Sequence, residues 1–317
     1  MLAVVVAGMP ATLLVTAAIV VAVRSRLGTP LGDAPPSAAP APFSKRHYVG
    51  WGAIAAVTAA LSLAGVGGAG ATSGFMLAAT VLGYLGGVSA PPPFRAAVHP
   101  VVACAAAANA AAAMLGAVTG SGYGATLGAY LTKGVGGAPP GAGDALMSLL
   151  GVVILSYGFR IAAARALIAR HAPEIGVGAV GSALFSLFAT GAFARFVGLA
   201  PAYARALAPR SVTVALALPI ADALGAPGSI AAAGVVLTGL LGANCAQALL
   251  DAARHTDPVT RGLATAGAAH GLGTAALARS EPDALPFCAL GYALIGVAAS
   301  VLASLPPVAA ALLAVTA

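Results

Sequence analysis

Long stretches without charge recur along this sequence, and they constrain its fold more than any other feature. A helix needs about 20 predominantly apolar residues to cross the hydrocarbon core of a bilayer. Runs of that length, or nearly so, occupy residues 2–23, 48–66, 72–88, 101–118, 144–162, 177–197, 229–250 and 284–303. Two further runs, 210–224 and 261–278, carry polar residues, and a short apolar tail covers 306–317. The pattern predicts an all-α polytopic membrane protein with about 10–12 transmembrane segments.

The composition supports this class. Only 7% of the 317 residues are charged, against roughly a quarter in a soluble domain. The net charge of +7 does not indicate a nucleic-acid partner, because the Lys and Arg residues are scattered between apolar runs instead of forming one basic patch. We therefore expect the lipid bilayer, and no nucleic acid, as the surroundings of this chain.

The positive charges also predict an orientation. Eight Lys and Arg residues lie in the loops 24–47, 89–100 and 160–176, and Arg95 is one of them. The positive-inside rule then places the N-terminus outside. Residues 28–44 are rich in proline and small residues and predict a linker. Met1 opens the first apolar run directly, so we see neither a signal peptide nor a transit peptide.

The run from Arg210 to Leu224 is too short to span a bilayer alone, since a helix of that length reaches only about 22 Å. We expect a half-helix with Pro209 at its first position. The free N–H groups of Ser211 to Thr213 and the Arg210 charge would then form an anion site. The alternative is an arginine at a loop end that extends to lipid headgroups.

The run at 261–278 contains His270, Gly271, Gly273 and Thr274 near its middle. Two glycines weaken a helix, so we expect a second broken segment here. An imidazole beside the break would bind substrate or carry a proton. The alternative is a histidine that packs between helices and bonds a carbonyl.

Two more polar residues have two interpretations each. Asn244, inside an apolar run, would contact a substrate hydroxyl or bond a neighbouring helix. Asp222 would be a group for proton coupling or a solvated carboxylate at a loop end.

The sequence shows no catalytic motif and no cysteine or histidine spacing typical of a metal site. We therefore expect no enzyme, no cofactor and no metal.

A weak internal similarity is also present. "GVVIL" at 151 resembles "GVVLT" at 234, and "RHAPEIG" at 170 resembles "RHTDPVTRG" at 254. With three spans between the copies, the repeats would be inverted in the membrane, as in many secondary transporters. Chance similarity in a chain rich in Ala and Gly is the other explanation.

Several motifs in order carry a resemblance to a known family. The segments "APRSVTVALALPIADALG", "GVVLTGLLGANCAQALL", "DPVTRGLATAGAAHGLGTAAL" and "EPDALPFCALGYALIGV" resemble the LrgB-type membrane protein family, and within it the plastid transporters. The resemblance implies an N-terminal, shortened LrgA-like region at 1–88 and an LrgB-like transport domain at 89–317.

The same resemblance implies a function. It predicts an antiporter of the chloroplast inner envelope that exchanges glycolate and glycerate in photorespiration. Arg210, Ser211, Thr213, Asn244, His270, Gly271, Gly273 and Thr274 would bind the carboxylate substrate, with His270 or Asp222 coupling a proton. Bacterial relatives imply the alternative, a holin-like protein that controls murein hydrolases. A homodimer fits both.

Overall fold

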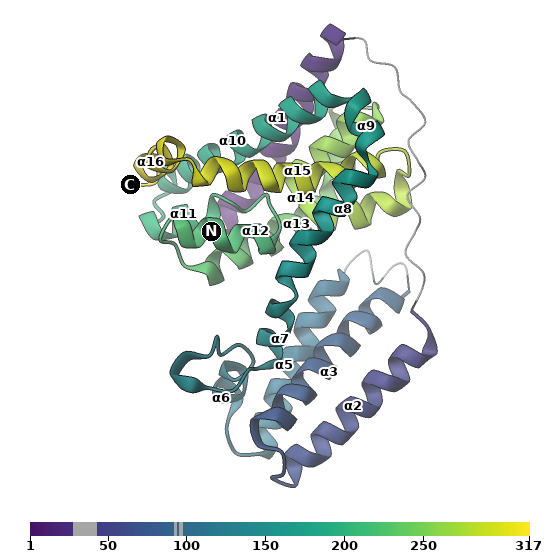
Figure 1. The fold of residues 1–317 in the computed structure, drawn as a ribbon, viewed down its shortest axis with the longest axis vertical. Helices are drawn as coiled ribbons and strands as arrows, with labels where there is room; N and C mark the ends of the chain where they lie inside the picture. Colours follow the sequence, from purple (N-terminus) through teal and green to yellow (C-terminus); the bar gives the residue numbers. More distant parts are fainter. Residues whose placement is uncertain (28–42, 92–93, 95–97) are drawn as a thin grey trace. The chain divides into compact units, whose positions relative to one another are not determined.

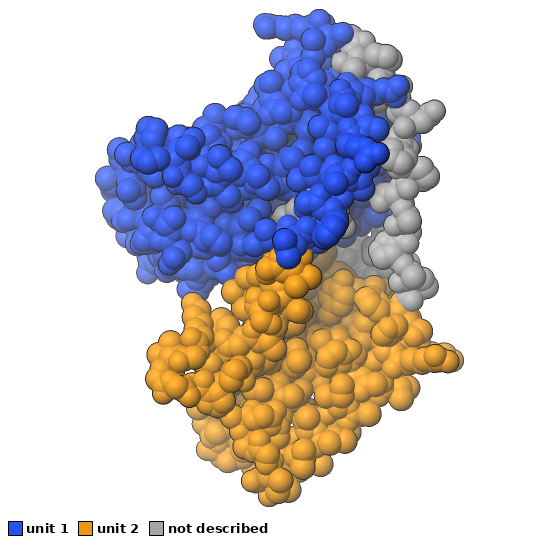
Figure 2. All heavy atoms as spheres, in the orientation of Figure 1, with its two compact units in different colours: residues 1–39, 154–317 blue, residues 40–153 orange. Residues whose placement is uncertain are grey.

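The computed structural model describes residues 1–27, 43–91, 94 and 98–317. Over these residues the chain is built from helices and turns with no strand, which confirms the all-helical prediction. The chain divides into two compact units, coloured in Figure 2: unit 1 comprises residues 1–39 and 154–317, and unit 2 comprises residues 40–153. Most of the predicted linker at 28–44 lies outside the described residues, and so does Arg95.

Unit 1 contains the first helix and the C-terminal half of the chain (Figure 1). Its helices are α1 (Leu2–Leu27), α9 (Arg165–Arg170), α10 (Ala172–Phe196), α11 (Pro201–Leu207), α12 (Val214–Ala223), α13 (Gly228–Ala252), α14 (Pro258–Ser280), α15 (Leu285–Ser304) and α16 (Pro306–Val315). Helix α8 (Leu150–Ala163) contains the division between the units.

Helix α14 lies in the centre of unit 1, where it packs against α1, α10, α13 and α15. Small residues make this packing close. A Cβ added to Gly242 of α13 would collide with Ala269 of α14, so the two backbones approach to a distance that only glycine permits. Such contacts explain why a chain so rich in Ala and Gly folds into a tight helical unit.

Unit 2 consists of α2 (Lys45–Leu63), α3 (Gly68–Ser89), α5 (Pro100–Val118), α6 (Tyr123–Gly128), the 3₁₀ turn η1 (Val135–Gly137) and α7 (Ala142–Ser148). Helix α3 packs against α2 and α5. Asp144 accepts hydrogen bonds from the backbone N–H groups of Thr132, Lys133 and Gly141, at 2.8–2.9 Å. This carboxylate therefore organises the Gly- and Pro-rich loop before α7.

Seven of the described helical segments are long and apolar enough to cross a membrane. They begin at Leu2, Gly68, Pro100, Ala142, Ala172, Gly228 and Leu285. Four further segments complete the predicted set: α2, the short apolar α12 and α16, and the broken α14. Since these segments follow the apolar runs of the sequence, the polytopic membrane class is confirmed.

The packing of α1 differs from what the family resemblance alone suggests. The division between regions 1–88 and 89–317 rests on sequence similarity and stays a prediction. In the structure, α1 packs against α10, α13 and α14 of unit 1. Met9, Leu13 and Ala17 of α1 form one hydrophobic cluster with residues of α13 and α14. The first helix is therefore a core element of unit 1.

The two copies of the internal similarity begin at the same end of unit 1. Arg24 of α1 contacts Glu174 in the first turn of α10, with Nη1 3.5 Å from Oε1. Its Nε also lies 3.2 Å from Oδ2 of Asp257, the N-cap of α14. Further along, Gly178 of α10 lies beside Leu263 of α14, and Ser182 lies beside Gly267. The helices α10 and α14 are therefore parallel, and these copies are not related by inversion.

Candidate anion-binding site

The site is centred on Arg210, which lies in the turn between the short helices α11 and α12. The side chain is only 1% exposed, which is exceptional for a guanidinium. Burial comes from three longer helices, α1, α10 and α13, that contribute the atoms around it. Of the two interpretations of this residue, burial favours the anion site over an arginine that extends to lipid headgroups.

Two threonine hydroxyls hold the guanidinium. Arg210 Nε donates to Oγ1 of Thr190 on α10 at 3.1 Å, and Nη2 donates to Oγ1 of Thr12 on α1 at 3.0 Å. Thr12 in turn donates to the carbonyl of Gly8 at 2.9 Å. Both partners of the charge are therefore neutral groups.

Gly8 makes room for the charge on the α1 side. A Cβ at this position would lie 2.5 Å from Arg210 Nη2 and 2.8 Å from Cζ. These distances are shorter than any normal van der Waals contact, so the guanidinium packs directly on the backbone of α1. Any larger residue at position 8 would displace it.

The third nitrogen of the guanidinium, Nη1, is buried and has no hydrogen-bond partner among the described residues. Within the same residues no carboxylate forms an ion pair with Arg210. An isolated buried charge costs several kcal/mol unless a counter-charge compensates it. The geometry therefore leaves one open donor on a fixed cation, which is what an anionic ligand requires.

The backbone next to Arg210 differs from the prediction. Helix α12 begins at Val214, with Thr213 at the N-cap position, and not at Pro209 as predicted. The N–H groups of Arg210 and Val212 are already bonded to the carbonyls of Leu207 and Pro209, at 3.0 and 3.1 Å. A cradle of free N–H groups from 211 to 213 is therefore wrong in part, because the chain makes a hydrogen-bonded turn before the helix starts.

Ser211 and Thr213, two further predicted residues, follow Arg210 in the sequence. Ser211 is 2% exposed, and its Oγ has no hydrogen-bond partner among the residues that the structure describes. Thr213 is half-buried. The site therefore offers a free hydroxyl from the residue after Arg210.

The predicted break in the second segment is confirmed, and it falls at His270 itself. His270 has φ 41° and ψ −136°, in the left-handed half of the map inside an otherwise helical α14. Its buried ring donates from Nε2 to the carbonyl of Val235 on α13 at 3.0 Å. Gly239 of α13 leaves the space for it, since a Cβ there would lie 2.5 Å from the ring.

Helix α13 connects the two irregular points. A Cβ on Gly234 would lie 3.8 Å from Cβ of Arg210, and the carbonyl of the next residue, Val235, binds His270. The turn between α11 and α12 and the break in α14 therefore meet α13 at the same level. Two interrupted helices at one level of a bundle are typical of a transporter binding site.

The other predicted residues lie elsewhere or are already engaged. Asn244 is exposed and donates to Leu240 of its own helix, about 15 Å along α13 from Gly234. Asp222 is exposed near the end of α12. The structure brings neither residue to Arg210, because both point out of unit 1.

Thr274 and the two glycines belong to the second half of α14. The Thr274 hydroxyl lies 3.4 Å from the His270 carbonyl and 3.3 Å from Sγ of Cys288. Gly273 packs on Ala269 within α14, whereas no atom lies near the position of a Cβ on Gly271. The contacts of Thr274 and Gly273 are with other residues of α14 and with α15, so they stabilise the helix beside the break.

Sequence analysis missed the hydroxyl groups that surround the guanidinium. Thr12 and Thr190 lie inside long apolar runs, where a single hydroxyl does not stand out. A usable signal was present: hydroxyls recur every four residues at 182, 186 and 190, and again at 12 and 16. That spacing places each set on one helix face.

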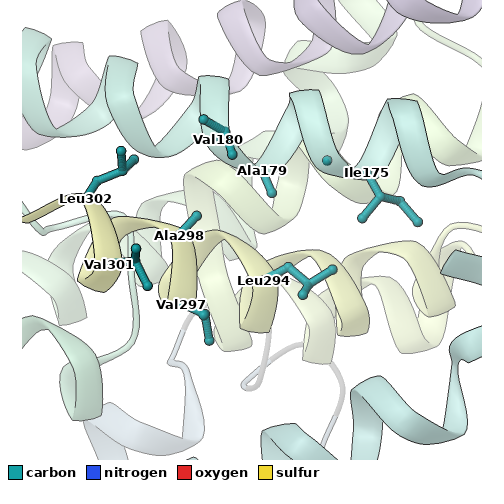
Figure 3. Close-up of a pocket in the computed structure, with 9 residues that line it drawn as sticks. Ile175, Ala179, Val180, Leu294, Val297, Ala298, Val301 and Leu302 are labelled. Atoms are coloured by element: carbon teal, nitrogen blue, oxygen red, sulfur yellow. The ribbon is translucent and has the colours of Figure 1, made fainter. Parts of the chain in front are cut away.

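A separate pocket of about 340 Å³ opens between α10 and α15 (Figure 3). Its lining residues are Ile175, Gly176, Ala179, Val180, Leu294, Val297, Ala298, Val301 and Leu302. The labelled side chains in Figure 3 are all hydrocarbon and come from these two helices. Such a lining has nothing to offer a carboxylate, so this pocket is not the anion site.

Comparison with known proteins shows which family this sequence matches. The sequence model of the LrgB-like family matches residues 80–308. The plastidal glycolate/glycerate translocator 1, chloroplastic, of Arabidopsis thaliana is 45% identical over 97% of this chain, and this chain spans 61% of that protein. No solved structure gives a significant match.

Bacterial proteins match over shorter segments. An uncharacterized protein of Haemophilus influenzae is 27% identical over 51% of this chain and 71% of its own length. The holin-like protein CidB of Staphylococcus aureus is 30% identical over 30% of this chain and 42% of its own length. Arg210, His270 and the whole of α13 lie inside the segment that the family model matches, whereas α1 lies outside it. The chain therefore belongs to the LrgB-like family.

Proposed function

We propose that this protein is a secondary transporter that exchanges small 2-hydroxy monocarboxylates, glycolate and glycerate, across a membrane. The buried Arg210, with an open Nη1 and no carboxylate partner among the described residues, carries the proposal. The name of the Arabidopsis relative supports the substrate class, and the two interrupted helices support a carrier. The name of the same relative supports a plastid membrane, and the proposal places the protein in the chloroplast inner envelope with a role in photorespiration.

In this proposal, Arg210 Nη1 and the Ser211 hydroxyl bind the substrate carboxylate. Charge-assisted hydrogen bonds of this kind are short and strong in a dry site. Because Arg210 and His270 are both buried, substrate enters only when the helices around the site separate on one side of the membrane. The interruptions at 208–213 and at His270 are the natural hinges for that motion.

His270 is proposed as the residue that carries a proton or contacts the substrate beside Arg210. In the structure its Nε2–H donates a hydrogen bond to the Val235 carbonyl, which fixes the tautomer of the neutral ring. Asp222, which is exposed, is the weaker candidate for coupling. We also propose a homodimer and no catalytic activity, and the mass of the purified protein in detergent tests the first point.

The test is uptake of labelled glycolate into proteoliposomes that contain glycerate, glycolate, pyruvate or no anion. We expect saturable uptake that internal glycerate accelerates. Arg210→Gln removes the charge, and loss of a buried charge pair typically costs about 2–5 kcal/mol. The variant should therefore lose transport by roughly 30-fold or more.

Arg195→Gln is the matched control. Arg195 is half-buried, and among the described residues its side chain donates to the carbonyl of Leu199 just after α10, so its loss should leave exchange intact. Normal exchange by Arg210→Gln would contradict the anion site. Unsaturable leakage in every condition would instead favour a holin-like function, which the similarity to CidB suggests.

A further inference from the structure

A column of buried hydroxyl groups extends from Arg210 between α1 and α10. Ser182, Ser186 and Thr190 follow at intervals of four residues on α10, and Thr12 and Thr16 face them from α1. Each of these five side chains is at most 4% exposed. Polar groups in such a dry environment are retained only where they find partners.

Four of the five hydroxyls have partners. Thr12 and Thr190 bind Arg210, while Thr16 Oγ1 lies 2.9 Å from Oγ of Ser182 and 2.7 Å from the carbonyl of Thr12. Ser186 is the exception. Its Oγ is buried and has no hydrogen-bond partner among the described residues.

Ser186 lies close to the charge along α10. It lies one helical turn, about 6 Å, from Thr190, whose hydroxyl binds the guanidinium of Arg210. A 2-hydroxy acid carries its carboxylate and its hydroxyl on adjacent carbons. With one hydrogen bond of about 2.8 Å at each end, it bridges groups separated by a helical turn.

We infer that Ser186 recognises the 2-hydroxyl of the substrate and thereby selects hydroxy acids over simple carboxylates. The inference rests on the proposed function and names a residue that determines its specificity. Arg210 binds the carboxylate that all such acids share, and Ser186 supplies the group that distinguishes them. A site built to hydrogen-bond a hydroxyl rejects an analogue without one, because its own polar group is then left unpaired.

The test compares glycolate with acetate, which has the same number of carbons and lacks the 2-hydroxyl. The full chain is reconstituted, KM is measured for labelled glycolate, and the inhibition constant is measured for acetate. For Ser186→Ala we expect the glycolate KM to rise about tenfold, which is roughly 1.4 kcal/mol. The inhibition constant of acetate should stay the same, so the preference for the hydroxy acid is lost.

Ser300→Ala is the control, because Ser300 donates to Gly296 of its own helix, α15. Ser186→Cys keeps the size of the side chain with a weaker donor, and it should give an intermediate preference. If Ser186→Ala inserts poorly, the cysteine variant decides the question by itself. An unchanged ratio of glycolate to acetate overturns the inference.

The outcomes separate this inference from the proposed function. Exchange that depends on Arg210 but keeps its preference in Ser186→Ala overturns only the role of Ser186. Absence of glycolate exchange in the unmodified protein overturns both. Loss of preference in Ser186→Ala, with Ser300→Ala unchanged, supports both.

Discussion

The contact between Thr12 and Arg210 gives the most informative single prediction. Thr12 lies on α1, outside the segment that the family model matches. Its hydroxyl accepts from Nη2 at 3.0 Å across 198 residues of sequence. Thr12→Val keeps the shape of the side chain and removes only the hydroxyl, whereas Thr12→Ser keeps the hydroxyl and removes a methyl group.

The magnitude follows from the chemistry of this contact. A hydrogen bond to a charged group is worth about 1.5–3 kcal/mol, and Nη2 would be left buried without its partner. We expect Thr12→Val to raise the KM for glycolate by roughly 10- to 100-fold. Thr12→Ser should stay within about fourfold of the unmodified protein, since the loss of one buried methyl group costs about 0.8 kcal/mol.

The assay is glycolate–glycerate exchange in proteoliposomes, with KM and maximal rate measured separately. A pure loss of packing would lower the amount of folded protein and thus the maximal rate, while a displaced guanidinium raises KM. Equal KM values for the valine and serine variants would refute the reasoning. They would show that α1 packs beside Arg210 without positioning it.

Two further predictions concern the break in α14 and its ends. His270→Gln keeps a hydrogen-bond donor but does not titrate between about pH 5 and 8. We expect uptake driven by a pH gradient to disappear in this variant while exchange survives. An unchanged pH response would assign His270 to packing. Arg261 binds Glu281 through two nitrogens and also reaches Asp251 and the His255 carbonyl. Arg261→Gln should destabilise unit 1 by about 1.5–3 kcal/mol, the usual worth of hydrogen bonds to charged groups in a partly exposed cluster. Arg261→Lys should rescue little because it cannot bind the carboxylate in a bidentate way. An unchanged melting temperature in detergent would contradict this.

The sequence predicted the helices and both interruptions, because chain length, proline and glycine act locally. It did not predict which helix face is buried, since runs of Ala, Val, Leu and Gly are apolar on every side. For that reason Asn244 was expected in the site although it points outward, and Thr12 was not expected there although it binds Arg210. The predicted start of α12, at Pro209, is five residues early, because a hydrogen-bonded turn and the first turn of a helix have similar sequence requirements.

The order of the helices around Arg210 also bears on how the protein is made. Translation proceeds from the N-terminus, so α1 and α10 have already been synthesised when Arg210 leaves the ribosome. The two threonines that bind the guanidinium are therefore already part of the chain when Arg210 is made. A membrane-inserting chain would otherwise expose this arginine to lipid at a cost of several kcal/mol. The hydroxyl groups of α1 and α10 are thus available to bind Arg210 as soon as this residue enters the membrane.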